Sequence, residues 1–430
     1  MSKIHQAEVA IVGAGIVGLA HAYAFAKRGH SVVVFERNPC AMGASIRNFG
    51  MIWPIGQIPG RWHRTAMQSR ALWLEVLTSA GLWHEEIGSL HVAYQDDEWQ
   101  VLSEFAAIAP GLGFSGTLLS PDEARQRSPY LRADGLRGAF WSATEVCVDP
   151  RAAIAELPTF LSEKLGVRFH FNTAVTAVED GVLLAGGLRW ETGRTVVCAG
   201  DDFQTLFPEV FVNSGIVRCK LQMMRSAPLS DGARIGPMLA GGLTLCHYPS
   251  FRECPGLPAL KERIARELPD HVRHGIHVMA AQNGLGEITI GDSHEYGQAV
   301  DIVDKAEIDD LVLSYLRSFL DVPGLKISQR WHGVYAKHPH DQIFRSKPRP
   351  TVEVVVVTTG VGMTLSFGLG EETAAGTAAA ATAAATAAAT AAATAAATAA
   401  ATAAATAAAT AGTAAGTAAA ATLSAMGGMA

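Results

Sequence analysis

A glycine-rich turn between a strand and a helix is the feature that most constrains the fold. Residues 8–12 form a short apolar run suited to a buried strand, and the turn Gly13-Ala-Gly-Ile-Val-Gly18 follows directly. Residues 19–28 have the composition of a helix, and residues 31–36 form a second, β-branched run. Strand, turn, helix and strand in this order predict a parallel βαβ unit with a right-handed crossover.

The turn also indicates what this unit binds. Gly13 permits a tight turn, Gly15 lets the backbone approach a pyrophosphate, and Gly18 lets the helix pack close to its strand. The N-terminus of the helix offers free N–H groups and a partial positive charge to the phosphates. Glu36 ends the second strand, where a carboxylate can accept hydrogen bonds from ribose hydroxyls. The unit therefore predicts a bound dinucleotide.

Composition excludes several other classes of protein. The net charge of −6 argues against a nucleic-acid partner, which requires clustered positive charge. The six cysteines are scattered and form no Cys-x-x-Cys pair, which argues against a disulfide framework and favours a reducing compartment. Residues 7–26 are mostly apolar but contain Glu8, His21 and the glycine turn, so we expect neither a signal peptide nor a membrane span. A cytoplasmic location is predicted.

Beyond the first unit, the middle of the chain differs in character. Residues 216–330 mix strand-like pieces with a helix and predict an antiparallel sheet with helices, whereas residues 352–359 are nearly all β-branched or apolar and should return to the buried parallel sheet. Further expected strands cover residues 167–171, 174–178, 194–199, 216–224, 277–281 and 288–291, and expected helices cover 62–80, 121–126 and 305–320.

The C-terminal tail, residues 373–430, is almost entirely Ala and Thr and carries no Lys, Arg, Asp or Glu. Thr recurs at every fourth residue from 382 to 410, so its stripe drifts by roughly 40° per repeat around a helix and leaves no fixed apolar face. We expect a frayed, solvent-exposed helix and infer no function from it. The tail occupies the place where a closing helix is expected after residues 369–372.

Three further glycine turns suggest a family. They are residues 43–51, which include Ala44-Ser45 and Gly50-Met51, residues 195–200, which end on Ala199-Gly200, and residues 358–364, which contain Gly360-Val-Gly-Met363. Together with the first turn, these segments resemble the D-amino-acid oxidase, glycine oxidase and sarcosine oxidase family of FAD-dependent amine oxidoreductases. The resemblance covers about residues 7–372.

The resemblance implies an α/β fold with two domains. A doubly wound, Rossmann-like FAD-binding domain would comprise residues 1–80, 145–215 and 328–372. An α+β substrate domain built on an antiparallel sheet would comprise residues 81–144 and 216–327.

The resemblance also implies how FAD is held. Ser45 would help to hold the pyrophosphate, the Gly50-Met51 segment would run beside the flavin, the backbone of Val175 would pair with adenine, and residues 360–364 would lie at the pyrimidine end of the flavin. Because residues 325–350 contain no cysteine, we expect non-covalent FAD. The full set of expected FAD-binding residues is Gly13, Ala14, Gly15, Gly18, Glu36, Arg37, Ser45, Asn48, Gly50, Met51, Val175, Ala199, Gly200, Gly360, Gly362, Met363 and Thr364.

The substrate segment departs from the family. The pattern Trp-x-Gly-x-Arg-Pro is present as Trp331-His-Gly-Val-Tyr335-Ala336, so Tyr335 stands where amino-acid-oxidising members carry the arginine that clamps a carboxylate. Arg330, His332 and Lys337 are nearby candidates to bind a different anion. Tyr248 is a candidate lid over the flavin face.

Residues 47–57 are similar to a subgroup associated with phosphonate catabolism, which is proposed to oxidise aminophosphonates related to 2-aminoethylphosphonate. A phosphonate has up to two negative charges and three acceptor oxygens, and suits several cations and hydroxyls better than one clamp. Arg47, Arg330, Tyr335 and Lys337 could form such a set.

The resemblance implies oxidation of a small amine by hydride transfer to flavin, with hydrolysis of the resulting imine to an aldehyde. The flavin is the catalyst, and no catalytic side chain is assigned. The alternatives are a D-amino acid or N-methylglycine as substrate, a 2-hydroxy acid, and a flavin-binding subunit without turnover. The electron acceptor, O2 or another, is not indicated.

Two groups of histidines are weak metal candidates. His271, His274 and His277 recur at every third residue, but the segment contains a glycine and turns into a strand. His338 and His340 are too close in sequence to converge easily on one ion. We therefore expect no metal.

Overall fold

The computed structural model describes residues 5–377, 386, 390–392 and 394. The chain divides into two compact units, residues 1–372 and residues 373–430. The sheets and helices below belong to the first unit, and its further division into FAD-binding and substrate domains stays a prediction.

The first large sheet contains the predicted βαβ unit. Strand β1 pairs in parallel with β2 on one side and with β12 on the other, and β20 continues the parallel arrangement beside the C-terminal half of β12. Antiparallel strands at residues 175–185 and 343–349 extend the sheet on the β12 side, whereas the opposite edge strand, residues 168–170, is parallel to β2, so the sheet is mixed. Among the described residues it has eight strands: β1 (His5–Val12), β2 (Val32–Phe35), β9 (Arg168–His170), β10 (Val175–Glu179), β11 (Val182–Ala185), β12 (Leu188–Val197), β19 (Ile343–Arg349) and β20 (Val352–Val357).

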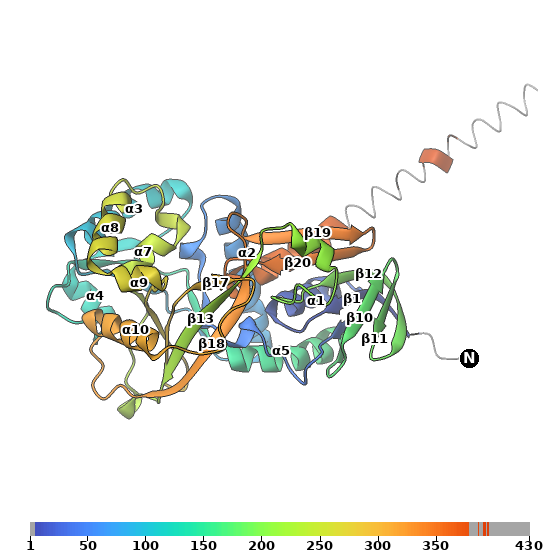
Figure 1. Ribbon diagram of the computed structural model, residues 1–430, viewed down its shortest axis with the longest axis horizontal. Helices are drawn as coiled ribbons and strands as arrows, with labels where there is room; N and C mark the ends of the chain where they lie inside the picture. The colour runs from blue at the N-terminus through green and yellow to red at the C-terminus, as the bar shows by residue number, and fades with distance from the viewer. Residues whose placement is uncertain (1–4, 378–385, 387–389, 393, 395–430) are drawn as a thin grey trace, which may run out of the picture. The chain divides into compact units, whose positions relative to one another are not determined.

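Helix α1 (Ile16–Lys27) is buried along almost its whole length. It packs against strands β1 and β2 and against helix α5 (Pro150–Leu165), and Figure 1 shows it in the right half of the first unit. Because both sides of the helix are covered, it carries apolar residues around its circumference instead of one stripe. It begins three residues earlier than predicted, since Gly15 is its N-cap.

The second large sheet is antiparallel except for one parallel pair, β5 with β14. Its long strands β13 (Val217–Ser226) and β18 (Ile327–Lys337) pair along their length and run between the two ends of the first unit in Figure 1. The other strands of this sheet are β5 (Ser89–Ala93), β6 (Thr117–Leu119), β7 (Gly138–Ser142), β14 (Met238–Ala240), β15 (Met279–Gln282), β16 (Ile288–Gly291) and β17 (Glu295–Gly297). The predicted antiparallel sheet is confirmed, and with it the α/β fold class.

Helices gather at the end of the second sheet that lies to the left in Figure 1. They bury a large apolar core that includes Phe105, Phe140 and Phe251, whose rings contact one another. These helices are α3 (Asp96–Leu112), α4 (Pro121–Arg127), α7 (Leu243–His247), α8 (Leu257–Glu267), α9 (Pro269–Arg273) and α10 (Ala306–Phe319). Also present in the first unit are α2 (Arg61–Ala80), α6 (Pro208–Val212) and a small sheet of β3 (Met51–Ile52), β4 (His84–Glu85) and β8 (Val146–Val148).

The expectation that the tail replaces a closing helix is wrong. A helix begins at Gly362 and continues through Glu372. Residues 363–370 are all buried, among them Leu365, Phe367 and Leu369, so this part of the helix is enclosed on all sides. The helix starts directly at the last glycine turn, earlier than the point at which we expected one.

Three described residues farther along the tail agree with the expected exposed helix, whereas Thr373 and Ala374 at its start are helical and buried. Thr386, Thr390 and Thr394 are helical and exposed, and the hydroxyls of Thr390 and Thr394 each donate to the carbonyl oxygen four residues earlier. This bond satisfies the Thr hydroxyl within the helix itself. The expected helix over the other residues of the tail lies outside the described part of the chain.

Helix length and hydropathy bear on the expected absence of a membrane span. None of the helices in the described part of the chain is both long and apolar enough to cross a bilayer.

Trp73 on α2 connects that helix to the helix that begins at Gly362. Its ring is fully buried against Phe367, at 4.9 Å between centroids, and its Nε1 donates to the carbonyl oxygen of Met363 at 2.6 Å. We expect Trp73→Ala to lower the free energy of unfolding by about 3–5 kcal/mol, because it leaves a large cavity. Trp73→Phe should cost less, because part of the ring remains. Urea denaturation measures both changes, and equal losses for the two variants would contradict this account.

Candidate active site

A long cavity connects the glycine turn of the βαβ unit with the antiparallel sheet. One end is lined by the turn itself and by the end of β2 with Glu36. The opposite end is lined by His247, Tyr248, Asp292 and His294. Segments 41–49, 198–202, 333–336 and 355–363 form the walls between the two ends.

The glycine turn leaves no space for side chains. Gly13 has φ of +100°, and a Cβ there would lie 2.5 Å from the carbonyl oxygen of Cys198. A Cβ on Gly15 would lie 3.1 Å from the Ser45 hydroxyl oxygen, and that hydroxyl accepts a hydrogen bond from the Ile16 amide at 2.9 Å. Glycine at positions 13 and 15 therefore brings the backbone at the start of α1 to the cavity wall, where the Ser45 hydroxyl is the group bound to the Ile16 amide.

Glu36 organises the end where the ribose is expected. Its carboxylate accepts hydrogen bonds from the Ala14 amide at 3.0 Å and from the backbone and side chain of Asn38 at 3.0 and 3.1 Å. Arg37 forms an ion pair of 2.7 Å with Asp202. Glu36 thus fixes the glycine turn and borders the cavity at the same time.

Most of the predicted FAD-binding residues line this cavity. They are Gly13, Gly15, Glu36, Arg37, Ser45, Asn48, Val175, Ala199, Gly200, Gly360, Gly362 and Met363.

The other predicted FAD-binding residues do not line the cavity but contact other residues of the first unit. The Ala14 amide donates to the carboxylate of Glu36. A Cβ on Gly18 would lie 1.9 Å from the carbonyl oxygen of Gly13, and a Cβ on Gly50 would lie 2.0 Å from the carbonyl oxygen of Val148. Met51 is buried on β3, and the Thr364 hydroxyl accepts a hydrogen bond from the Trp53 amide at 2.9 Å.

The last glycine turn meets the substrate strand. Gly360 has φ of +74°, and a Cβ there would lie 3.2 Å from Cζ of Tyr335 on β18. Gly362 begins the closing helix and lines the cavity, so the positive end of this helix borders it. Tyr335 is half-buried, and desolvation of its phenol raises the pKa well above the ordinary value. It is a neutral hydrogen-bonding group.

Arg47 is a cation in the wall of the cavity. A Cβ on Gly333 would lie 3.5 Å from Cβ of Arg47, so the arginine packs beside β18, two residues from Tyr335. Its guanidinium donates to the His332 carbonyl oxygen at 3.3 Å and has no acidic partner among the described residues.

Lys337 and Tyr248 complete this end. The backbone of Lys337 pairs with that of Thr359 in an isolated antiparallel β-bridge, and Thr359 lines the cavity. Burial lowers the pKa of the Lys337 ammonium. Tyr248 lines the cavity, and its hydroxyl contacts Sδ of Met279 at 3.1 Å.

Arg330 and His332 do not line the cavity, contrary to the expectation that they bind substrate. Side chains alternate along β18, so these two residues point away from the face that carries Tyr335. Arg330 binds Asp309 at 2.8 Å, and the His332 ring lies 2.9 Å from Asp304.

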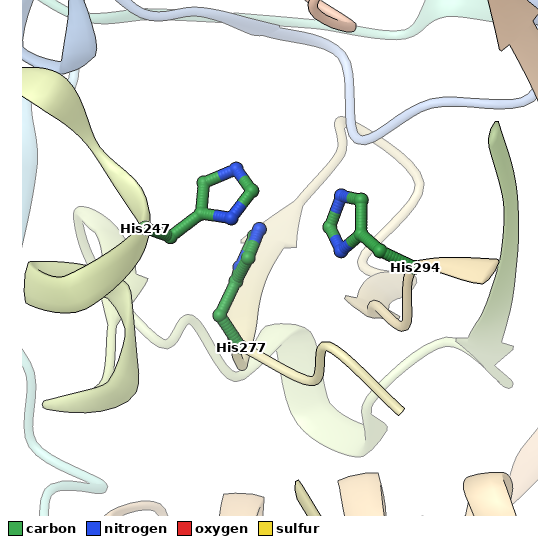
Figure 2. Close-up of side chains that lie close together, drawn as sticks. All are labelled: His247, His277 and His294. Carbon is green, nitrogen blue, oxygen red and sulfur yellow. The ribbon is translucent and has the colours of Figure 1, made fainter. Parts of the chain in front are cut away.

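Three histidines converge at the substrate end, and we did not predict this group. Figure 2 shows that the rings of His247, His277 and His294 face one another. The ring centroid of His247 lies 3.9 Å from that of His277 and 4.8 Å from that of His294. Burial lowers the pKa of the His277 and His294 imidazoles, to about 4 for His294, so these two are neutral at pH 7, whereas the His247 side chain is exposed. They come from three separate segments, so local spacing carried no signal.

Solved structures share the fold. L-proline dehydrogenase from P. horikoshii superposes with a TM-score of 0.70 at 22% identity, over 86% of this chain and 93% of that one. Glycine oxidase from Geobacillus kaustophilus gives a TM-score of 0.68 at 19% identity, over 85% and 93% of the two chains. At this identity the likeness shows the fold alone.

Sequence comparison identifies the family. Glycine oxidase of Geobacillus kaustophilus (strain HTA426) is 31% identical over 258 residues, which are 58% of this chain and 61% of that protein. D-amino acid dehydrogenase of Neisseria meningitidis (strain Z2491) is 24% identical over 294 residues, which are 54% of this chain and 70% of that protein. The family model "FAD dependent oxidoreductase" matches residues 8–376. The glycine turns that border the cavity fit this cofactor, and the chain belongs to the family of FAD-dependent oxidoreductases.

Proposed function

We propose that the protein oxidises the C–N bond of a small amine that also carries an anionic group, with an aminophosphonate related to 2-aminoethylphosphonate as substrate. The observation that carries the proposal is Arg47, whose guanidinium lies in the cavity wall beside β18 without an acidic partner among the described residues. An unpaired cation at this place calls for an anion from the ligand.

The neighbouring groups favour an anion with several oxygens. Lys337 adds positive charge beside the same end of the cavity, and the neutral phenol of Tyr335 can donate a hydrogen bond. The three donors come from a loop and from two positions on one strand. They suit the three acceptor oxygens of a phosphonate better than they reproduce the single planar clamp that binds a carboxylate.

The chain's own residues prepare the amine for oxidation. FAD, when bound, supplies the hydride acceptor for the carbon that carries the amine. The positive charges of Arg47 and Lys337 disfavour a protonated amine nearby, and oxidation requires the unprotonated form. The resulting imine reacts with water to give a carbonyl compound and an amine. Orientation by the anion contacts is the protein's main contribution.

Oxidation of glycine, N-methylglycine or a D-amino acid is the second candidate. The similarity to a glycine oxidase and a D-amino acid dehydrogenase favours it, and Arg47 could also bind a carboxylate. A flavin-binding subunit without turnover is the remaining alternative. Non-covalent attachment of FAD, the identity of the electron acceptor and a cytoplasmic location stay predictions.

Anaerobic titration of the FAD-loaded protein tests the proposal. The amines are 2-aminoethylphosphonate, its N-methyl and 1-hydroxy forms, glycine, N-methylglycine and D-alanine, and the readout is loss of the oxidised-flavin absorption. We expect an aminophosphonate to reduce the flavin. Arg47→Met should weaken its apparent affinity about 10–100-fold, as the loss of a charged hydrogen bond does.

The matched control is Arg64→Met, because Arg64 is an exposed arginine on α2. Reduction by glycine or D-alanine without reduction by any phosphonate would contradict the proposed substrate. Equal affinities for wild type and Arg47→Met would contradict the role of Arg47.

The lowered pKa of Lys337 predicts a pH dependence of anion binding. Lys337 attracts an anion only while it is protonated, and burial moves its loss of charge to a lower pH than for an ordinary lysine. Affinity for ethanesulfonate, which stays ionised throughout, should therefore fall as the pH rises from neutral toward about 10. The fall should be much smaller in Lys337→Met and unchanged in Lys347→Met, whose residue is exposed on β19. Flavin difference spectra measure the affinity, and the same fall in Lys337→Met would refute this role.

A further inference from the structure

We propose that His247, His277 and His294 bind a divalent transition-metal ion of the zinc type at the substrate end of the cavity. We further propose that the ion's open coordination position takes an anionic oxygen of the substrate, a role that rests on the proposed function.

The three imidazoles come from separate segments that the fold brings together, as Figure 2 shows. His247 ends α7, His277 precedes β15, and His294 lies between β16 and β17. Backbone hydrogen bonds hold two of these segments in place: the amides of His277 and Asp292 each donate to the other residue's carbonyl oxygen, at 3.2 and 2.8 Å. Backbone hydrogen bonds therefore fix the segments of His277 and His294 relative to each other.

The ring nitrogens are arranged as in metal ligands. Nδ1 of His294 lies 2.9 Å from the Gly275 carbonyl oxygen, which can only accept, so Nδ1 carries the proton and Nε2 keeps its lone pair. Nε2 of His277 lies 3.2 Å from Oδ1 of Asp292, within reach of a hydrogen bond after a small rotation of the ring. Nδ1 of His277 is buried and has no hydrogen-bond partner among the described residues. A backbone carbonyl and a carboxylate are the usual partners of metal-bound histidines.

The distances require a modest closure of the site. One nitrogen from each ring lies within 4.8 Å of the others. Zn–N bonds of about 2.0–2.1 Å place tetrahedral ligands about 3.3 Å apart, so the most distant rings must approach by up to about 1.5 Å. His247 is the ligand that can move, because it lies at the end of a short helix and its side chain is accessible from the cavity.

The position of the cluster decides what the ion would do. Three protein ligands leave a fourth position open, as in catalytic zinc sites. His247, His294 and Asp292 line the cavity, so the open position faces the substrate end. A divalent ion held by the three rings would present positive charge to an anion at this end of the cavity.

Zinc binding to the FAD-loaded protein tests the site. After dialysis against a chelator, Zn²⁺ is titrated by calorimetry, and bound zinc is counted by mass spectrometry. We expect one tightly bound zinc per chain, with affinity lowered by more than about 100-fold in His247→Gln and in His294→Gln, and about 10–100-fold in Asp292→Asn, which removes a supporting contact.

The matched control is His271→Gln, because His271 is a buried histidine outside the cluster. It should bind zinc like wild type. Circular dichroism and the flavin spectrum show whether each variant is folded and loaded. Zinc binding that is absent from wild type, or unchanged in both His247→Gln and His294→Gln, would overturn the proposal.

Anaerobic amine titrations with and without zinc separate this inference from the proposed function. Tighter binding of an aminophosphonate in the presence of zinc supports both. Zinc bound at the three histidines without flavin reduction by any of the amines supports the site and contradicts the proposed function. Reduction by an aminophosphonate in protein that binds no zinc contradicts the site and leaves the proposed function standing.

Discussion

The close approach of α1 to the end of β1 is the contact on which the rest of the structure depends. A Cβ on Gly18 would lie 1.9 Å from the Gly13 carbonyl oxygen, and one on Gly13 would lie 2.5 Å from that of Cys198. Glycine at both positions therefore lets the start of α1, the end of β12 and the end of β2 meet around one cavity. The hydrogen bond from the Ala14 amide to Glu36 connects the turn to the second strand. This packing brings the glycine backbone and the N-terminus of α1 to the cavity wall, where they fit the pyrophosphate of FAD.

The substrate end depends on a different element, the long strand β18. Its alternating side chains place Tyr335 toward the last glycine turn, while Gly333 lets Arg47 pack against the strand. The chain thus has a tyrosine on the strand, where the family resemblance led us to expect an arginine, and it has an arginine on a neighbouring loop. The positive charge therefore lies on a loop of the cavity wall and not on the strand. The proposed substrate class rests on this position of the charge.

Local patterns predicted the parts of the molecule that local chemistry determines. The βαβ unit with its glycine turn and the antiparallel middle sheet followed from periodicity and turn residues, because each depends on neighbours in sequence. The other cavity-lining glycines were assigned from the family resemblance. Arg330 and His332 were assigned to the substrate because they lie close to Tyr335 in sequence. The alternation of a strand sends them to Asp309 and Asp304 instead. The histidine cluster was not predictable in this way, since only tertiary packing brings its three segments together.

The crystal structure of the FAD-loaded protein with ethylphosphonate, which lacks the amine and is not oxidised, tests the central claim most directly. That claim is that Arg47 has taken over the anion-binding role at the substrate end of the cavity. The account predicts phosphonate oxygens within hydrogen-bonding distance of the Arg47 guanidinium, near Tyr335 and the histidine cluster. A phosphonate bound in the cavity without contact to Arg47, or bound at Arg330 on the opposite face of β18, would contradict it.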